Sequence, residues 1–312
     1  MRPVIDMRPS FADFEANALT VLPEVHNFVL LERLNVTKNR LTKLPASIGG
    51  CCHLKSLYAD GNRIQQILFT FENLTQLQLF NLSHNELPMV HSSIGFASSL
   101  EILHLHYNHL VTLPYTIGLL TNLTRLTLHD NPSVGIPKQV LSAGIDIAVS
   151  FLKKMLDANE SKQIWLNNMH LYTVPLPNVA QVAEFMAWRR IRILNLDRNE
   201  LHNLPVELCV LDELEVCYTP NITTVFLPQI KLLLQVLSVE HNRLTTVTPT
   251  LAQLSRLQVL AIGNNQIQSL PQALKKLIQL EELLLETNSL TAVPLMIPSL
   301  ISLTDLRFDN NR

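Results

Sequence analysis

The sequence predicts an α/β solenoid, a coil of stacked turns that builds a parallel, concave β-sheet. Two periodic features predict this fold: an asparagine at a nearly fixed interval and a frame of apolar residues around it. Most neighbouring asparagines of the series are 23 residues apart. The series comprises Asn17, Asn39, Asn62, Asn85, Asn108, Asn131, Asn199, Asn242, Asn265, Asn288 and Asn311.

The apolar frame keeps the same spacing around nearly every asparagine of the series. Apolar residues lie eight, five and three positions before Asn39 and two positions after it, which gives L-x-x-L-x-L-x-x-N-x-L. This spacing is that of the leucine-rich repeat. Because the L-x-L core has a period of two, its leucines share one face of a short strand. Only stacked copies of the strand can bury that face.

The asparagine has a predicted structural role. The chain turns sharply after each strand, and a buried amide can donate and accept hydrogen bonds to the backbone of its own turn and of the next. Six residues further on, a proline recurs, which suits an extended convex segment because proline fixes φ and lacks an N–H. The prolines place Met169 and Ile222 at degenerate asparagine positions, so we expect about thirteen repeats.

A helical insertion, residues 138–160, interrupts the repeats. Apolar residues share one face of an amphipathic helix predicted from Ser142 to Asn159, and these two residues would cap its ends. The insertion separates an N-terminal block, residues 1–137, from a C-terminal block, residues 161–312, and we expect the blocks to be continuous. The helix either plugs a break in the coil, forms a hinge or docks a partner.

Two further expectations concern the C-terminal block. A shorter helix is predicted from Asn178 to Arg190. Because the chain ends at Arg312, one residue after Asn311 and before the convex half of the last repeat, we expect the sequence to be a fragment of a longer protein.

Composition restricts the class of protein. Apolar residues make up 47% of the chain and charged residues 16%, which excludes a disordered chain. The net charge of −2 gives no general reason to expect nucleic acid or an anionic membrane as partner. Four cysteines form no disulfide framework, and the N-terminus has no signal-peptide pattern, so we expect a cytoplasmic protein. No membrane span is expected, because Pro294 and Pro298 interrupt the long uncharged stretch from Thr287 to Thr304.

The repeat frame extends to L-x-x-L-x-L-x-x-N-x-L-x-x-L-P-x-x-I-x-x-L, as in Leu31 to Leu54 and Leu100 to Leu123. It resembles intracellular leucine-rich repeat proteins, including Ras-pathway scaffolds, Scribble-like polarity proteins, plant Ras-group proteins and ROCO-type GTPases. The stretch from Asn131 to Lys153 is similar to the segment that often closes a repeat block in these proteins. The resemblance implies protein binding on the concave sheet, often for the assembly of signalling complexes.

The sequence shows no enzyme motif. It contains no P-loop, no dinucleotide-binding glycine pattern, no G-x-S-x-G, no H-E-x-x-H and no C-x-x-C. We therefore expect no catalytic residue, no resident metal, no cofactor and no small-molecule substrate.

The open face of the predicted sheet carries the candidate binding residues. Six of the eleven histidines fall between residues 84 and 129, where neighbouring imidazoles could hold a metal or sense pH, or could simply be solvated. Four aromatic residues are expected on this face, either as interface anchors or as structural rings. Acidic residues gather toward its C-terminal end and could orient a basic partner segment. The candidates are Tyr58, His104, His106, Tyr107, His129, Trp165, Arg198, Tyr218, Glu240, Glu286 and Arg307.

The predicted function is therefore a non-catalytic scaffold or adaptor that binds another protein on its concave surface, in intracellular signalling. The alternative is a regulatory region of a larger enzyme, such as a kinase, GTPase, phosphatase or ligase, with its catalytic domain outside this chain.

Overall fold

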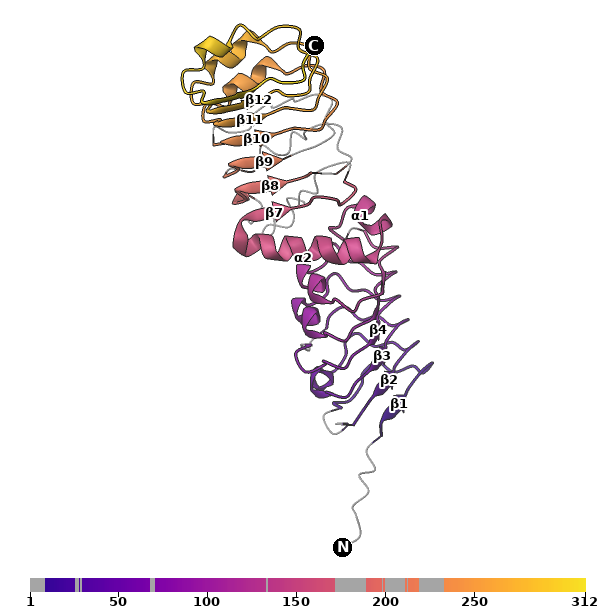
Figure 1. Ribbon diagram of the computed structural model, residues 1–312. Coiled ribbons are helices and arrows are strands. Elements are labelled where there is room, and N and C mark those ends of the chain that lie inside the picture. The colour runs from indigo at the N-terminus through magenta and orange to yellow at the C-terminus, as the bar shows by residue number, and fades with distance from the viewer. Residues whose placement is uncertain are drawn as a thin grey trace. The chain divides into compact units, whose positions relative to one another are not determined.

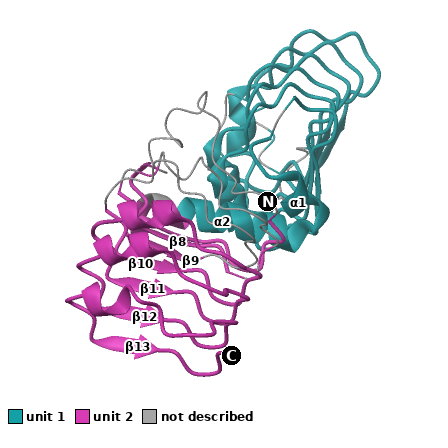
Figure 2. Ribbon diagram, turned by 90° about the horizontal axis from the view of Figure 1, so that it is seen from above, with its two compact units in different colours: residues 1–156 teal, residues 157–312 magenta. Residues whose placement is uncertain are grey.

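The computed structural model describes residues 9–25, 28, 30–67, 71–132, 134–171, 189–197, 199, 211, 213–218 and 233–312. The chain forms two compact units, residues 1–156 and residues 157–312 (Figure 2).

Each unit contains one parallel sheet whose strands follow one another in chain order. In the described residues the first sheet has six strands and the second has seven (Figure 1). The first sheet consists of β1 (Phe11–Asp13), β2 (Arg33–Asn35), β3 (Ser56–Tyr58), β4 (Leu79–Asn81), β5 (Ile102–His104) and β6 (Arg125–Thr127). The second consists of β7 (Gln163–Trp165), β8 (Ile193–Asn195), β9 (Val216–Tyr218), β10 (Val236–Ser238), β11 (Val259–Ala261), β12 (Glu282–Leu284) and β13 (Asp305–Arg307).

The strands lie where the repeat frame predicts them. The central residue of most strands is buried, as Leu34, Leu57 and Leu103 show, and equivalent leucines pair across neighbouring strands. The predicted α/β solenoid is therefore confirmed. The number of repeats stays a prediction, because many residues of the second block, including Ile222, lie outside the described ranges.

In the described residues the parallel strands form two sheets, and the expected continuity of the two repeat blocks stays a prediction. The break falls between β6 and β7, where two α-helices, α1 (Lys138–Ser142) and α2 (Ile145–Ser161), interrupt the repeat. The division of the chain at residues 137 and 161 itself stays a prediction. The helix predicted from Asn178 to Arg190 lies almost entirely outside the described residues.

Short 3-10 helices form the segments opposite the strands. They are η1 (Ala46–Gly50), η2 (Ser92–Phe96), η3 (Tyr115–Leu119), η5 (Pro249–Gln253), η6 (Gln272–Lys276) and η7 (Ile297–Ser299). Pro45, Pro114 and Pro271 precede three of them with φ of −66°, −67° and −70° and extended ψ. The recurring proline thus sets the extended entry to each of these turns, where no ladder needs its missing N–H.

The helical insertion differs from its prediction at both ends. Ser142 ends α1 and does not cap α2, because Gly144, with φ of 118°, separates the two helices. Helix α2 continues to Ser161, so Asn159 lies within it. Its buried residues are Ala148, Phe151, Leu152, Met155 and Ala158. The long helix is thus present as predicted, but neither predicted cap is correct.

Helix α2 packs on the last 3-10 helix of the first unit. A Cβ atom on Gly118, in η3, would overlap the backbone nitrogen of Lys153 in α2. Glycine at position 118 is therefore required by this close approach of two backbones.

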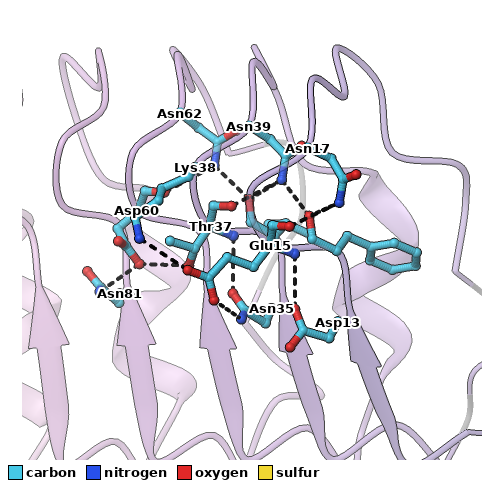
Figure 3. Close-up of polar contacts among 12 residues, drawn as sticks. Asp13, Glu15, Asn17, Asn35, Thr37, Lys38, Asn39, Asp60, Asn62 and Asn81 are labelled. Carbon is cyan, nitrogen blue, oxygen red and sulfur yellow. Dashed lines mark hydrogen bonds and ion pairs between the residues drawn. The ribbon is translucent and has the colours of Figure 1, made fainter.

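The repeated asparagines form a ladder of buried hydrogen bonds. The Asn108 amide nitrogen donates to the carbonyl oxygens of Leu82, Leu105 and His106 at 2.9, 3.0 and 3.4 Å. Its Oδ1 accepts from the Leu87 N–H at 3.0 Å. Figure 3 shows the same arrangement at the N-terminal end of the ladder. Each asparagine therefore joins its own turn to the preceding turn, and the expectation that it joins the next turn was wrong in direction.

Asn17 marks the beginning of the ladder. It is exposed, and its amide nitrogen donates only within its own turn, to the carbonyl oxygens of Phe14 and Glu15. In the interior of each unit the asparagine is buried, as in Asn108 and Asn265.

The residue directly before the asparagine has a left-handed backbone in most repeats. Its φ is 54° at Lys38, 53° at His84, 52° at Tyr107 and 55° at Asp130. This conformation is uncommon for residues other than glycine and costs about 1 kcal/mol or more. The sharp turn after each strand imposes it, and it brings one additional side chain per repeat to the end of the strand.

Candidate binding surface

In each unit we call the face of the sheet that points away from the buried leucines the concave face. It carries the first and third residues of each strand and side chains from the turn that follows. None of the described helices is both apolar enough and long enough to pass through a membrane.

The N-terminal part of the first concave face is a self-contained polar network (Figure 3). Asp60 accepts hydrogen bonds from the Thr37 hydroxyl and the Asn81 amide, both at 2.9 Å. Glu15 accepts from the Asn35 amide and pairs with Lys38, both at 3.2 Å. These side chains are held by one another, so this part of the face is polar and ordered by its own contacts.

Tyr58 belongs to the same part of the face. The guanidinium carbon of Arg33 lies 4.9 Å from the centre of the Tyr58 ring and 5.2 Å from that of Phe11. This is a cation–π arrangement between two rings. Tyr58 is half-buried, and part of its ring already has an intramolecular partner.

Five rings gather on the C-terminal part of the first concave face, and we call them the ring cluster. Imidazoles of His106 and His129 stack with centroids 4.6 Å apart, and His104 meets His106 edge-on at 5.8 Å. Tyr107 stacks on His84 at 4.4 Å. The rings come from three successive turns, those of β4, β5 and β6. The predicted proximity of His104, His106 and His129 is thus present in the structure.

The Nδ1 atoms of the cluster are held from within. The Thr127 hydroxyl lies 2.9 Å from Nδ1 of His104 and 2.8 Å from Nδ1 of His106. Nδ1 of His129 lies 2.6 Å from a carboxylate oxygen of Asp130. One nitrogen of each of these three imidazoles is thus held within the protein, and Nε2 is the remaining polar atom of each ring.

Burial and neighbouring charged groups shift the pKa values of residues in this cluster. Burial lowers the pKa of His104, and Arg125 lowers it further, whereas Asp60 raises it. Burial also lowers the pKa of His106, with contributions from its three histidine neighbours, while Asp130 raises it. Hydrogen bonds from His129 and Tyr107 lower the pKa of Asp130. Burial therefore favours the neutral form of His104 and His106.

On the second concave face two aromatic side chains flank one asparagine. Trp165 is 43% exposed, and its indole N–H donates to the Gln163 side chain at 3.3 Å. Trp165 pairs in register with Asn195, and Asn195 pairs with half-buried Tyr218. Tyr107 is 47% exposed. Trp165 and Tyr107 are therefore the most exposed of the four predicted aromatic residues.

The predicted acidic residues lie along the same face. Burial raises the pKa of Glu240, and the negative charge of Glu286 raises it further. Between them lies Gly263, where a Cβ atom would be only 2.9 Å from the Glu286 carboxylate carbon. Arg307 bonds Asp305 on its own strand at 3.3 Å. Arg198 lies outside the described residues.

The described residues contain no group of three or more histidine, cysteine, aspartate or glutamate side chains that converges on a metal position. In the ring cluster the imidazoles face one another's rings and the Thr127 hydroxyl. Cys51, Cys52 and Cys217 are free thiols, and burial raises the pKa of Cys217 to about 12. Cys217 is thus a small core residue, as its position in the frame predicts.

Comparison with known proteins agrees with the repeat geometry. Residues 233–290 match the family profile described as "Leucine rich repeat". No curated protein matches the chain. The fold is a leucine-rich repeat solenoid.

Solved structures with similar repeats come from distant sources. An LRR protein of Leptospira interrogans is 26% identical, with 96% of this chain and 78% of that chain covered and a TM-score of 0.44. An internalin of Listeria monocytogenes is 18% identical, with 97% and 82% covered and a TM-score of 0.41. The LRR ectodomain of the plant membrane receptor kinase GASSHO1/SCHENGEN3 from Arabidopsis thaliana is 22% identical, with 93% and 40% covered and a TM-score of 0.43.

Sequence reasoning missed two members of the candidate surface, His84 and Asp130. Both occupy the left-handed position directly before the repeat asparagine. The strand period assigns faces only within the strand, so it does not place a residue in the following turn. The signal that finds them is their distance from the asparagine.

Proposed function

We propose that this protein is a non-catalytic binding module that holds another protein on its concave faces. The fold is typical of protein-interaction domains. A preformed sheet offers a broad surface that needs little ordering on binding. The observation that carries the proposal is the exposure of Tyr107 and Trp165, two large rings on open sheet faces.

The chemistry of these rings supports an interface. Tyrosine and tryptophan are enriched at the centres of protein interfaces, since they bury much apolar area and retain a polar tip. Tyr107 lies within the ring cluster, and Trp165 lies two strands from Tyr218, with Asn195 between them. Each unit therefore has its own aromatic anchor.

Affinity capture with substitutions on each face tests the proposal. Trp165→Ala and Tyr107→Gly are expected to reduce capture of a native partner at least tenfold, the size of a typical interface hot spot. Leu295→Ala is the matched control, because Leu295 is 83% exposed but follows Pro294 on the convex side. Equal capture by all four proteins would refute the proposal.

A role as a scaffold for intracellular signalling is the finer form of this proposal. The exposed free thiol of Cys52 supports a reducing compartment, where such a group persists. The experiment is fractionation of cells that express the protein, with mass-spectrometric identification of what it captures. Recovery of the protein outside the cell, with Cys52 oxidised, would contradict it.

A further inference from the structure

We propose that the ring cluster on the first concave face binds a carboxylate-rich segment of a partner protein, and that this binding strengthens as the pH falls below neutrality. This inference rests on the proposed function, because it names the partner chemistry of one of its two faces. It is carried by the arrangement of the imidazole nitrogens.

The hydrogen bonds to Nδ1 decide what the cluster offers at neutral pH. The Thr127 hydroxyl has one proton, so it can donate to Nδ1 of only one of its two histidine neighbours and must accept from the other. His129 donates from Nδ1 to the Asp130 carboxylate. Of the three Nε2 atoms of His104, His106 and His129, two are then acceptors and one is a donor.

Protonation changes this pattern completely. In the imidazolium form both ring nitrogens are donors. The Thr127 oxygen has two lone pairs and can accept from both of its neighbours, so Nδ1 of each ring remains satisfied. The Nε2 atoms of His104 and His106 then become charged donors on neighbouring rings, whose centroids lie 5.8 Å apart. Carboxylates accept such hydrogen bonds best, because they are acceptor-only and oppositely charged.

The charges around the cluster favour the same partner. The fixed charges that act on these rings belong to Arg125, Asp60 and Asp130, and they amount to one negative charge. Asp60 is already held by Thr37 and Asn81, and Asp130 by His129. When the imidazoles are protonated, the sum becomes positive, and the carboxylates within the protein have partners of their own. An additional carboxylate then has charge to neutralise.

These charges disfavour nucleic acid as the occupant. A nucleic-acid strand needs a track of permanent cations along its phosphates. Here Arg125 is accompanied by Asp60 and Asp130, so the surroundings of the rings repel phosphate at neutral pH. An acidic peptide differs because its carboxylates are spaced along a chain that also carries groups able to pack on Tyr107.

The sign of the pH dependence follows from linkage. Burial holds the free-state pKa of His104 and His106 below the ordinary value of 6.5. A bound carboxylate raises both pKa values, so the protein takes up protons when it binds. Binding therefore tightens as the pH falls from the bound-state pKa values toward the free-state values. Below the free-state values no further gain is expected.

The test uses the full chain and a short labelled peptide of alternating glutamate and serine. Fluorescence anisotropy at about pH 7.5 and about pH 5.5 compares binding above and below the ordinary imidazole pKa while glutamate stays ionised. We expect the dissociation constant to fall about tenfold or more at the lower pH, one unit of pKa shift being a factor of ten. The double substitution His104→Gln and His106→Gln should remove this gain.

Two controls separate the cluster from general protonation. His53→Gln removes an exposed histidine of the same unit that does not belong to the cluster, and it should retain the full pH dependence. A peptide of alternating lysine and serine should not bind more tightly at the lower pH. Loss of the gain in His53→Gln, or its persistence in the double variant, would overturn the proposal. So would pH-dependent binding of a single-stranded oligonucleotide in place of the peptide.

A second measurement covers the case in which the double variant unfolds. Imidazole titration of the wild-type chain by NMR should show the pKa values of His104 and His106 rising when the glutamate peptide is added. Unchanged values would overturn the proposal. If the peptide fails to bind but Tyr107→Gly still abolishes protein capture, only this inference fails and the proposed function stands.

Discussion

The two units share one skeleton but differ in the chemistry of their concave faces. Asn108 in the first unit and Asn265 in the second make the same four kinds of hydrogen bond. The first face carries imidazoles whose pKa is lowered, and the second carries Glu240, whose pKa is raised. In both cases burial disfavours the charged form.

This difference shows how a repeat protein separates stability from recognition. The positions that face the core and the ladder are constrained by packing and hydrogen bonding, so they read alike in both units. The positions on the open face have no such constraint, and their side chains can differ from turn to turn. The following predictions test the shared part first and the distinct parts afterwards.

The largest expected effect is on the shared ladder. Asn108→Ala and Asn265→Ala should each lower the free energy of unfolding by about 3 kcal/mol or more, because each leaves several buried backbone groups without a partner. Urea denaturation followed by circular dichroism measures both. Asn17→Ala, at the exposed beginning of the ladder, should cost less than about 1 kcal/mol. A large cost in only one unit would show that the ladders are not equivalent.

A smaller effect is expected where α2 closes the first unit. Gly118→Ala places a Cβ atom on the α2 backbone and should cost about 1–3 kcal/mol through the forced shift of the helix. Gly50→Ala is the matched control, since no atom lies within 4 Å of its added Cβ. Hydrogen exchange of α2 peptides should rise in Gly118→Ala alone. Unchanged protection of α2 would mean that this contact does not hold the helix.

The response to pH should distinguish the units. The folded-state pKa of His104 and His106 lies below 6.5, so their contribution to stability is present above the unfolded pKa and is lost as the pH falls toward the folded values. After allowance for solvent screening, this loss should be less than about 1 kcal/mol. It is measured by urea titration at two pH values. Tryptophan emission reports the second unit, since Trp165 and Trp188 both belong to it. If only the tryptophan signal, which reports the second unit, showed a pH-dependent urea midpoint, the expected difference between the units would be wrong.

Glu240 has the opposite sign. Its folded pKa is raised above 4.5, so its contribution to stability is present below the unfolded pKa and is lost as the pH rises through the folded value. At neutral pH its charge is unfavourable, and Glu240→Gln should stabilise the second unit by a few tenths of a kcal/mol. Asp309→Asn, at an exposed position of the same face, serves as control. Destabilisation by Glu240→Gln would indicate a structural role for the carboxylate.

The smallest expected change in stability is that of Tyr107→Gly. Glycine adopts φ of 52° without strain, which offsets the lost contact with His84 and the greater freedom of the unfolded chain. The melting temperature should therefore change little while partner capture falls. A sharp drop in melting temperature would identify the ring as structural and remove it from the candidate surface.

The sequence predicts the repeat fold well because nearly every repeat carries the same residue types at the same spacing. The strand positions, the buried leucines and the proline before η1, η3 and η6 all follow from one spacing. The ring cluster follows only in part. His104 and His106 share a face by strand period, but His84 joins them because the left-handed turn redirects it. No local pattern contains that turn geometry.

Contacts between turns account for the other differences. Tyr58 is predicted on the open face as an interface anchor or a structural ring, and the Arg33 guanidinium from the neighbouring strand lies 4.9 Å from the centre of its ring. Helix α2 ends beyond its predicted cap. It packs against Gly118 through Lys153, a residue more than thirty positions away in the sequence. Such contacts depend on where the coil brings separate segments, which a residue's own neighbours in the chain do not specify.

By itself the sequence determined the coil, its strand register and the identity of the buried ladder, because these rest on short-range periodicity and on backbone groups that must be satisfied inside an apolar core. Only the tertiary structure decided the division into two sheets, the arrangement of the five rings of the ring cluster, and the lowered pKa values of His104 and His106. Those depend on distances between successive turns, and hydrogen bonding, burial and pKa all respond to such distances and not to sequence spacing alone.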